Sequence, residues 1–391
     1  MAAFGDPGHA FPAIALGTEL ARRGHDVTLE TWAKWREHVE REGMRFSPAP
    51  EYQVFPTRER PLKPYEAAVR ASAVTRQLVR EVDPELVVVD ILTVAAALAA
   101  ELEDRPWATL VPHVLPTGEP GFPVYAVGAV YPRSALGRWA WGRTRPLLMR
   151  GEEQGRRELN ETRRRVGLPP LAHVQGGISQ ELALVATFPQ LEYPRARPQP
   201  GARVTGPLLW EQPYHEVELP PRDEPLVLIA PSTSQDPDGR LLRAALDGLA
   251  SEPVRVLAST NRRASADRLP LPANAQLVDW ISYARTMPLC DAVVCHAGHG
   301  TLARALASGA PVVACPHAGD MAENSARVRW AGVGVSLPRR LQTARGMRLA
   351  LRRLLGEPEY ARRAGELRDW AARNDGAVTA ADVLEAYTPG G

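Results

Sequence analysis

Cysteine is scarce in this sequence of 391 residues, and its net charge is small. It has three cysteines, Cys290, Cys295 and Cys315. This odd number in or beside apolar segments predicts reduced core thiols rather than a disulfide framework. The formal net charge is only +2, so we expect no polyanion-binding surface and no nucleic-acid partner. Reduced thiols and the lack of a visible signal peptide predict a cytoplasmic protein.

A long uncharged apolar run is also missing. The longest apolar segment, LVVVDILTVAAALAAEL, begins at Leu86 and has Asp90 near its middle. That charge would cost several kcal/mol inside a bilayer. A buried strand that ends at Asp90, followed by an alanine-rich helix, explains the segment better. We therefore expect no membrane span.

What the chain does have is a regular alternation of apolar strands and helical patterns. In the first half VTLE, LVVVD, ATLVP and LALVAT are predicted strands, and in the second half PLVLIAP, VRVLAST, DAVVCHAG and APVVACP. This alternation is typical of parallel sheets covered by helices on both faces. The length suits two such domains. The predicted fold class is therefore α/β, with two Rossmann-like, doubly wound domains facing a cleft.

A proline-dense segment without periodicity separates the two halves. We expect a first domain over residues 1–205, a linker over 206–224 and a second domain over 225–373. Residues 374–391 are predicted to form a helix that crosses back to the first domain. The first strand, MAAF, has only four residues before a glycine loop. This short strand leads us to expect that a few residues precede Met1 in the full protein.

The stretch CHAGHGTLARALASG, beginning at Cys295, occupies a predicted strand-to-helix turn. Its glycines allow close backbone approach, and the amides of the following helix favour an anion, so a phosphate site is expected. A turn that uses glycine only for its backbone geometry is the alternative. Zinc would need further ligands, and no Cys or carboxylate stands at a ligand spacing nearby. The spacing of a dinucleotide-binding fingerprint is absent as well.

Two further segments have both a structural and a functional interpretation. Asp320 and Glu323 in PHAGDMAENSARV are spaced as an N-cap and its capping-box partner. The same carboxylates follow a strand, where ligands bind in open sheets. Trp280 in VDWISYARTM stands in a short loop, where it either packs or stacks on a base.

The ordered set W…HAGHGT…P…GD…EN resembles the donor-binding half of family 1 GT-B glycosyltransferases, and the likeness extends over essentially the whole chain. Within this family, the sequence most resembles the bacterial enzymes that attach sugars to antibiotics and other small natural products. The resemblance implies a UDP- or dTDP-sugar donor, a small hydrophobic acceptor, no cofactor and no required metal, in a monomer or homodimer. It assigns donor binding to Ser232, Thr233, Ser234, Trp280, Ile281, His296, Gly298, His299, Gly300, Thr301, Asp320 and Met321.

The matching N-terminal element is FGDPGHAFPAIAL, in which a glycine loop places His9 at the start of a helix. A lone surface histidine is usually inert. In the family, however, the histidine of this context is the general base of an inverting transfer, and Pro12 completes the match. Imidazole has a suitable pKa for the task. We assign Asp90 as the carboxylate that orients His9; the alternative is that Asp90 caps the following helix.

Acceptor contacts are expected from the segment VPHVLPTGEPGFPVYAVGAVYPRSALGRWAWG, which is rich in proline, glycine and aromatics. Its candidate cleft-lining residues are His113, Phe122, Tyr125, Trp139 and Trp141. The alternative is that they are ordinary core residues.

Two positions depart from the family pattern. Met321 stands where many relatives have a glutamine that binds sugar hydroxyls, and Arg304 stands where many have a glutamate that binds the ribose. Loss of the ribose-binding carboxylate is compatible with a deoxyribose nucleotide such as dTDP. Two other functions remain open: a non-catalytic auxiliary protein with a degenerate nucleotide site, and a nucleotide-sugar 2-epimerase.

Overall fold

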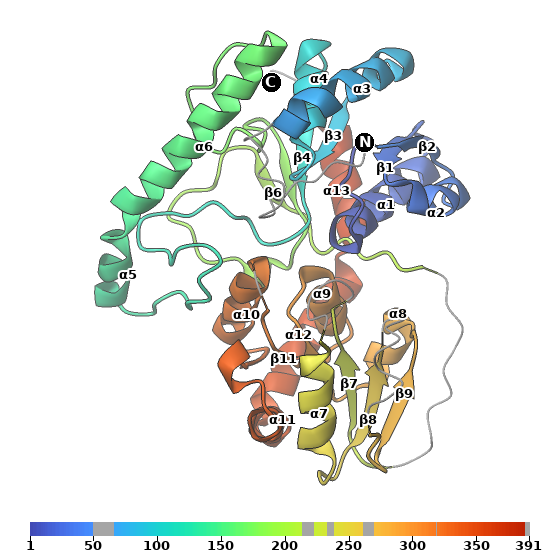
Figure 1. The fold of residues 1–391 in the computed structure, drawn as a ribbon, viewed down its shortest axis with the longest axis vertical. Coiled ribbons are helices and arrows are strands. Elements are labelled where there is room, and N and C mark those ends of the chain that lie inside the picture. The colour runs from blue at the N-terminus through green and yellow to red at the C-terminus, as the bar shows by residue number, and fades with distance from the viewer. Residues whose placement is uncertain (50–65, 213–222, 233–237, 261–269, 318, 388–391) are drawn as a thin grey trace.

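The structure is a computed structural model that describes residues 1–49, 66–212, 223–232, 238–260, 270–317 and 319–387. Two parallel sheets with helices around them lie one above the other, with the N-terminal half at the top of Figure 1. The fold class predicted from the sequence is confirmed.

The first sheet is built in two pieces that one residue joins. Ala2 forms parallel bridges to Glu30 on one side and to Val89 on the other. The short segment MAAF therefore runs where a central strand would lie. Parallel pairs link β1 to β2, and β3 to β4, β5 and β6 in that order. The strands are β1 (Thr28–Thr31), β2 (Arg45–Pro48), β3 (Val87–Asp90), β4 (Trp107–Val111), β5 (Ala183–Val185) and β6 (Ala202–Val204).

Among the described residues, six α-helices and two 3-10 turns accompany the first sheet. They are α1 (Pro7–Arg22), α2 (Arg36–Arg41), α3 (Glu66–Val82), α4 (Val94–Leu102), α5 (Ala135–Gly142) and α6 (Arg145–Val166), with η1 (Ala33–Trp35) and η2 (Pro189–Leu191). Helix α1 begins with Pro7, whose fixed φ suits a first helical position. It ends just before Gly24, which has a φ of +93°. His9 lies in the first turn of this helix, as predicted.

The second sheet has six parallel strands in the order β12-β11-β10-β7-β8-β9. They are β7 (Leu226–Ala230), β8 (Arg255–Ser259), β9 (Ala275–Val278), β10 (Ala292–Cys295), β11 (Val312–Ala314) and β12 (Gly334–Ser336). The helices are α7 (Arg240–Leu249), α8 (Tyr283–Thr286), α9 (His299–Ala307), α10 (Asp320–Ala331), α11 (Ala344–Gly356) and α12 (Pro358–Arg373), with 3-10 turns η4 (Met287–Leu289) and η5 (Arg339–Leu341).

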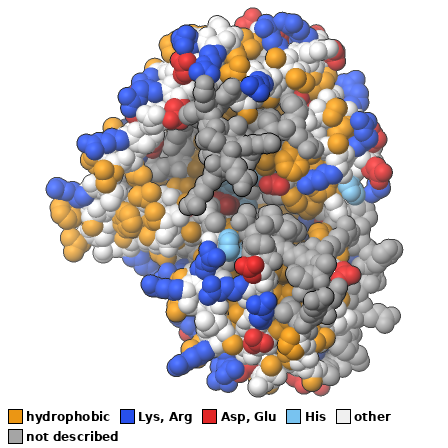
Figure 2. Space-filling model, in the orientation of Figure 1, with side chains coloured by type: hydrophobic (Ala, Val, Ile, Leu, Met, Phe, Trp, Pro, Cys, Tyr) orange, Lys and Arg blue, Asp and Glu red, His pale blue; other side chains and the backbone are white. Residues whose placement is uncertain are grey.

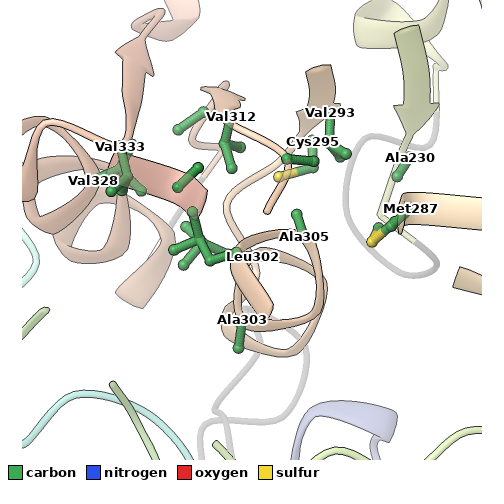
Figure 3. Packing of buried hydrophobic residues seen from close by; sticks show 14 of the residues in the cluster. Ala230, Met287, Val293, Cys295, Leu302, Ala303, Ala305, Val312, Val328 and Val333 are labelled. Atoms are coloured by element: carbon green, nitrogen blue, oxygen red, sulfur yellow. The ribbon is translucent and has the colours of Figure 1, made fainter. Parts of the chain in front are cut away.

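Both faces of the second sheet are buried, which explains its continuous apolar strands. Along β10, Val293 and Cys295 face one apolar cluster and Val294 faces the other. The first cluster packs Leu302 of α9 and Val328 of α10 against the sheet (Figure 3). Each large aliphatic side chain buried in this way contributes about 1.5–3 kcal/mol to folding. The three cysteines are buried and free, as predicted.

The last described helix, α13 (Gly376–Glu385), packs against α1 of the first half. Arg23, at the end of α1, donates to Asp382 and Glu385 at 2.7 Å each. Asp375 begins α13 by accepting from the backbone N–H of Ala377 at 2.8 Å. The domain limits given above stay a prediction, since residues 213–222 of the expected linker lie outside the described residues. No helix in the described ranges is long and apolar enough to cross a membrane.

Candidate functional site

The candidate catalytic residues come from three neighbouring strand ends of the first sheet. His9 follows the segment that carries the Ala2 bridge, Asp90 is the last residue of β3, and His113 stands two residues after β4. The carboxyl ends of parallel strands share one edge of a sheet, where ligands bind in open α/β folds. This register is why residues more than 80 positions apart meet at one point.

His9 and Asp90 form a tight pair. His9 Nδ1 lies 2.8 Å from Asp90 Oδ2, and Asp90 is 1% exposed. The second carboxylate oxygen accepts from the backbone N–H of Leu92 at 3.0 Å. An ionised carboxylate only accepts hydrogen bonds, so Nδ1 carries the proton and Nε2 is the basic nitrogen. Helix α4 begins later, with Thr93 as its N-cap, so the alternative that Asp90 caps this helix is wrong.

The environment of His9 favours the protonated imidazole. Burial acts most strongly and opposes the charge, but Asp90, Asp320 and Asp6 together outweigh it, so the pKa of His9 is raised above its ordinary value. Asp320 belongs to the second half of the chain. Its charge therefore acts at His9 across the space between the two sheets. A proton taken up by His9 is stabilised on the ring.

The candidate donor residues follow four strand ends of the second sheet. Ser232 comes after β7, Trp280 after β9, His296 after β10 and Asp320 after β11. The backbone N–H of Ser232 donates to His296 Nδ1 at 2.8 Å, which ties the first of these segments to the HAGHGT turn. Thr233 and Ser234, also expected to bind phosphate, lie outside the described residues.

The glycines of the HAGHGT turn are not required by its backbone. Gly298 has a φ of −60° and Gly300 lies inside α9, so neither adopts a left-handed conformation. A Cβ added at either position would meet no atom of the described chain within 4 Å. These glycines therefore leave open space in front of the first turn of α9, whose N–H groups have no partner within the helix. The interpretation of these two glycines as turn geometry alone is wrong.

Asp320 does not act as an N-cap. The residue before α10 is Gly319, with a φ of 59°, and α10 begins at Asp320 itself. Asp320 Oδ2 accepts from Asn324 Nδ2 at 3.3 Å, and the same amide donates to the Ala297 carbonyl at 2.9 Å. The capping-box interpretation of this segment is therefore wrong. Instead the buried Asn324 joins the HAGHGT turn to the Asp320 carboxylate.

The remaining donor candidates lie beside these groups. Trp280 and Met321 are half-buried, in the loop after β9 and in the first turn of α10. Ile281 is 3% exposed and belongs to the core, so only its backbone can face a ligand. The His299 side chain points away to the first half, where Nε2 lies 3.2 Å from the Ala186 carbonyl. Burial lowers the pKa of His299 to about 4, which keeps this contact neutral.

Among the acceptor candidates, His113 lies nearest to His9. The two ring centroids are 6.4 Å apart, with the planes close to perpendicular. His113 Nδ1 donates to the Val114 carbonyl at 2.8 Å, and burial lowers the pKa of His113. Tyr125 continues the row, 6.5 Å from the His113 ring. The His113 ring, whose lowered pKa favours the neutral form, therefore lies near both the candidate base and Tyr125.

Two acceptor predictions are wrong. Trp139 is 62% exposed on α5, with the Arg143 guanidinium over its ring, because α5 projects away from the sheets. Figure 2 shows hydrophobic side chains gathered on this projection. Phe122 is buried among the rings of Tyr131 and Tyr193, so it holds its own loop together. Trp141 is a half-buried residue of α5.

A buried ionic contact that the sequence did not reveal joins the two halves beside the site. Arg327 of α10 is 2% exposed and donates to Glu323 at 2.7 Å and to the Leu191 carbonyl at 2.9 Å. Its guanidinium stacks 3.4 Å from the centroid of Tyr193. A carboxylate oxygen of Glu192 lies 3.5 Å from the same guanidinium. Its only sequence signal, an arginine four residues after Glu323, is common on exposed helices.

A cavity of about 760 Å³ lies elsewhere, lined by Met1, Thr28, Leu86 and Val87 among others. These residues are at the amino ends of the first-sheet strands, the edge that open α/β sheets do not use for ligands. In the described ranges, no three His, Cys, Asp or Glu side chains gather where they could hold a metal ion.

Both the sequence and the fold of this chain are similar to those of known proteins. Residues 243–385 match the family model of the erythromycin biosynthesis protein CIII-like C-terminal domain. The chain is 29% identical to 4'-demethylrebeccamycin synthase of Lentzea aerocolonigenes over 97% of this chain and 96% of that protein. The solved structure of the kitacinnamycin glycosyltransferase superposes with a TM-score of 0.76 at 21% identity, covering 98% and 97% of the two chains.

The chain is a glycosyltransferase of the GT-B fold. The glycosyltransferase VinC, solved in complex with dTDP, is also similar, with a TM-score of 0.71 at 18% identity over 98% of each chain. The resemblance of the HAGHGT and GD…EN segments to this fold family is thereby confirmed. In the GT-B glycosyltransferase described here, the candidate base and the candidate donor residues stand at the two facing sheet edges.

Proposed function

We propose that this glycosyltransferase moves a hexose from a dTDP- or UDP-sugar to a small hydrophobic natural-product acceptor, with inversion and without a metal ion. His9 is the general base and Asp90 orients it. The single observation that carries the proposal is the buried His9–Asp90 pair at 2.8 Å. Asp320, a candidate donor residue, also raises the pKa of His9. The similarity to 4'-demethylrebeccamycin synthase and to the erythromycin biosynthesis protein supports the acceptor class.

The proposed reaction is a direct displacement at the anomeric carbon. The acceptor hydroxyl gives its proton to His9 Nε2 while its oxygen bonds to the carbon. The bond from that carbon to the diphosphate oxygen breaks on the opposite face, and the nucleotide diphosphate leaves with the electron pair. The N–H groups at the start of α9 meet the developing phosphate charge. One displacement inverts the anomeric configuration.

Arg304 favours a deoxyribose nucleotide in this scheme. Burial lowers the pKa of Arg304, and the Glu211 carboxylate acts in the opposite direction. Glu211 also accepts from Ser282 Oγ at 2.8 Å, beside the loop of Trp280. A cation at position 304 cannot accept hydrogen bonds from ribose hydroxyls, so this position lacks the carboxylate that would bind both hydroxyls of a ribose.

The test measures nucleotide binding and transfer separately. A thermal-shift panel of dTDP, UDP and GDP comes first, followed by incubation of dTDP-glucose or UDP-glucose with planar hydrophobic alcohols. We expect stabilisation by dTDP or UDP and a new β-linked glycoside from the α-linked donor, with the same rate in EDTA. A retained anomer or a rate abolished by EDTA would overturn the mechanism. Nucleotide binding without transfer or hydrolysis of any donor would favour the auxiliary protein instead.

A further inference from the structure

Tyr125 stands out because its polar atom is buried without a partner. The hydroxyl oxygen is shielded from solvent and makes no hydrogen bond to any residue that the structure describes. Buried polar groups are nearly always hydrogen-bonded, because an unpaired one loses its water contacts and gains nothing. The side chain is held in this position by its loop. The hydroxyl therefore requires a partner that the free chain does not supply.

The loop of Tyr125 is attached to α10 of the second half. The backbone N–H of Ala126 donates to Glu323 Oε2 at 3.2 Å. A Cβ added at Gly128 would meet Ala322 at 3.4 Å, so the loop backbone also lies directly on this helix. Ala126 and Gly128 have φ values of 65° and 74°, which turn the chain tightly at the contact. Tyr125 is thus fixed beside the first turn of α10.

The charges around Tyr125 locate its hydroxyl on the donor side of the reaction centre. Burial raises the pKa of Tyr125, and the carboxylates of Asp320 and Glu323 raise it further. The Asp320 charge also acts on His9 and His113. The charge of Asp320 therefore acts on the base, on His113 and on Tyr125. The His113 ring lies 6.4 Å from the ring of His9 and 6.5 Å from that of Tyr125. In the proposed reaction the sugar is held at Asp320, and the acceptor oxygen that His9 deprotonates attacks it. The sugar therefore occupies this same space.

We propose that the Tyr125 hydroxyl forms a hydrogen bond with a hydroxyl group of the donor sugar, so that both halves of the chain recognise the donor. This inference rests on the proposed function. It reassigns Tyr125 from acceptor binding to sugar specificity. Met321, the other residue expected to contact the sugar, has only a thioether sulfur, which is a weak hydrogen-bond acceptor. A sugar hydroxyl satisfies the buried phenol because each group both donates and accepts.

The test compares nucleotides with and without the sugar. Isothermal titration of dTDP, dTDP-glucose, UDP and UDP-glucose is performed on the wild type, on Tyr125→Phe and on the control Tyr131→Phe. Tyr131 belongs to the same connection, and its ring stacks on that of Tyr193. We expect Tyr125→Phe to bind the free nucleotides unchanged and to bind the nucleotide sugars about 2- to 12-fold more weakly, the loss for one neutral hydrogen bond. Tyr131→Phe should match the wild type.

A second readout concerns the free protein. Because the hydroxyl has no partner before the donor binds, Tyr125→Phe should unfold at the same temperature as the wild type or a higher one. A destabilised Tyr125→Phe would mean that the hydroxyl has a protein partner, and the proposal would be wrong. Equal losses for dTDP and dTDP-glucose, or a loss confined to the KM of the acceptor, would overturn it as well. If the wild type binds no nucleotide or nucleotide sugar, it is the proposed function that fails.

Discussion

Replacing Asp90 with asparagine tests the proposed base most directly, because the change removes one charge and keeps the shape. In the wild type both carboxylate oxygens accept hydrogen bonds, one from His9 Nδ1 and one from the N–H of Leu92. Asparagine has only one oxygen. If it stays with Leu92, the amide NH₂ faces His9 Nδ1 and requires that nitrogen to accept. The proton then resides on Nε2, and the imidazole is in the wrong tautomer to act as a base.

The expected loss is large for this reason. A missing or mis-oriented general base lowers the rate by about 10²–10⁴-fold, which is about 2.7–5.5 kcal/mol of transition-state stabilisation. The pH profile should change too. The base acts only when neutral, and Asp90 holds the pKa of His9 above its ordinary value. Activity therefore falls as the pH drops through that raised pKa. In Asp90→Asn the acidic limb should move to lower pH.

The assay is kcat/KM for transfer to an ordinary alcohol between pH 5 and 9, with dTDP binding measured on the same samples. His9→Ala and the double variant His9→Ala/Asp90→Asn belong in the series, since Asp90 should add nothing once His9 is gone. Asp291→Asn is a matched control, because Asp291 accepts only from the N–H of Leu226, at the far edge of the second sheet. Near wild-type activity in Asp90→Asn with an unmoved acidic limb, or additive losses in the double variant, would refute the reasoning.

Three further changes probe other parts of the molecule. Trp280→Ala should weaken nucleotide binding by about 1–3 kcal/mol, the range for stacking on a base; an unchanged dissociation constant would make Trp280 a packing residue. Met321→Gln should shift the ratio of kcat/KM for dTDP-glucose over a dTDP-deoxyglucose several-fold toward glucose, since each regained hydrogen bond contributes roughly 0.5–1.5 kcal/mol. A ratio that moves the other way would contradict this role. Arg327→Ala leaves the buried Glu323 without its cation, although the N–H of Ala126 still donates to it. This change should lower the free energy of unfolding by about 3–5 kcal/mol in urea titrations; a loss below 1 kcal/mol would show that the contact is not structural.

Much of the fold could be predicted because its strands are apolar throughout. The eight apolar segments predicted as strands in the two halves are all strands of the two parallel sheets. The ninth, MAAF, forms only an isolated bridge at Ala2. The ones missed are β2, β6, β9 and β12, which have three or four residues and are half-buried or partly exposed. Such segments carry no continuous apolar signal, and only pairing with a neighbour makes them strands. The segment that contains α5 was predicted to supply acceptor contacts and not a helix. This helix has no buried residue, so it lacks the apolar face of a helix that packs on a sheet.

The sequence by itself determined where the candidate site would lie. A strand followed by glycine and a helix start creates free N–H groups and open space by local geometry alone, so His9, His296 and Asp320 could be placed at strand ends. What only the tertiary structure decided is which of these groups face each other. The 2.8 Å pair of His9 and Asp90, the Arg327 contact to Leu191 and the burial of the Tyr125 hydroxyl each join segments that are far apart in the chain. Such contacts depend on sheet register and on how the two halves pack, and no local pattern of residues encodes those distances.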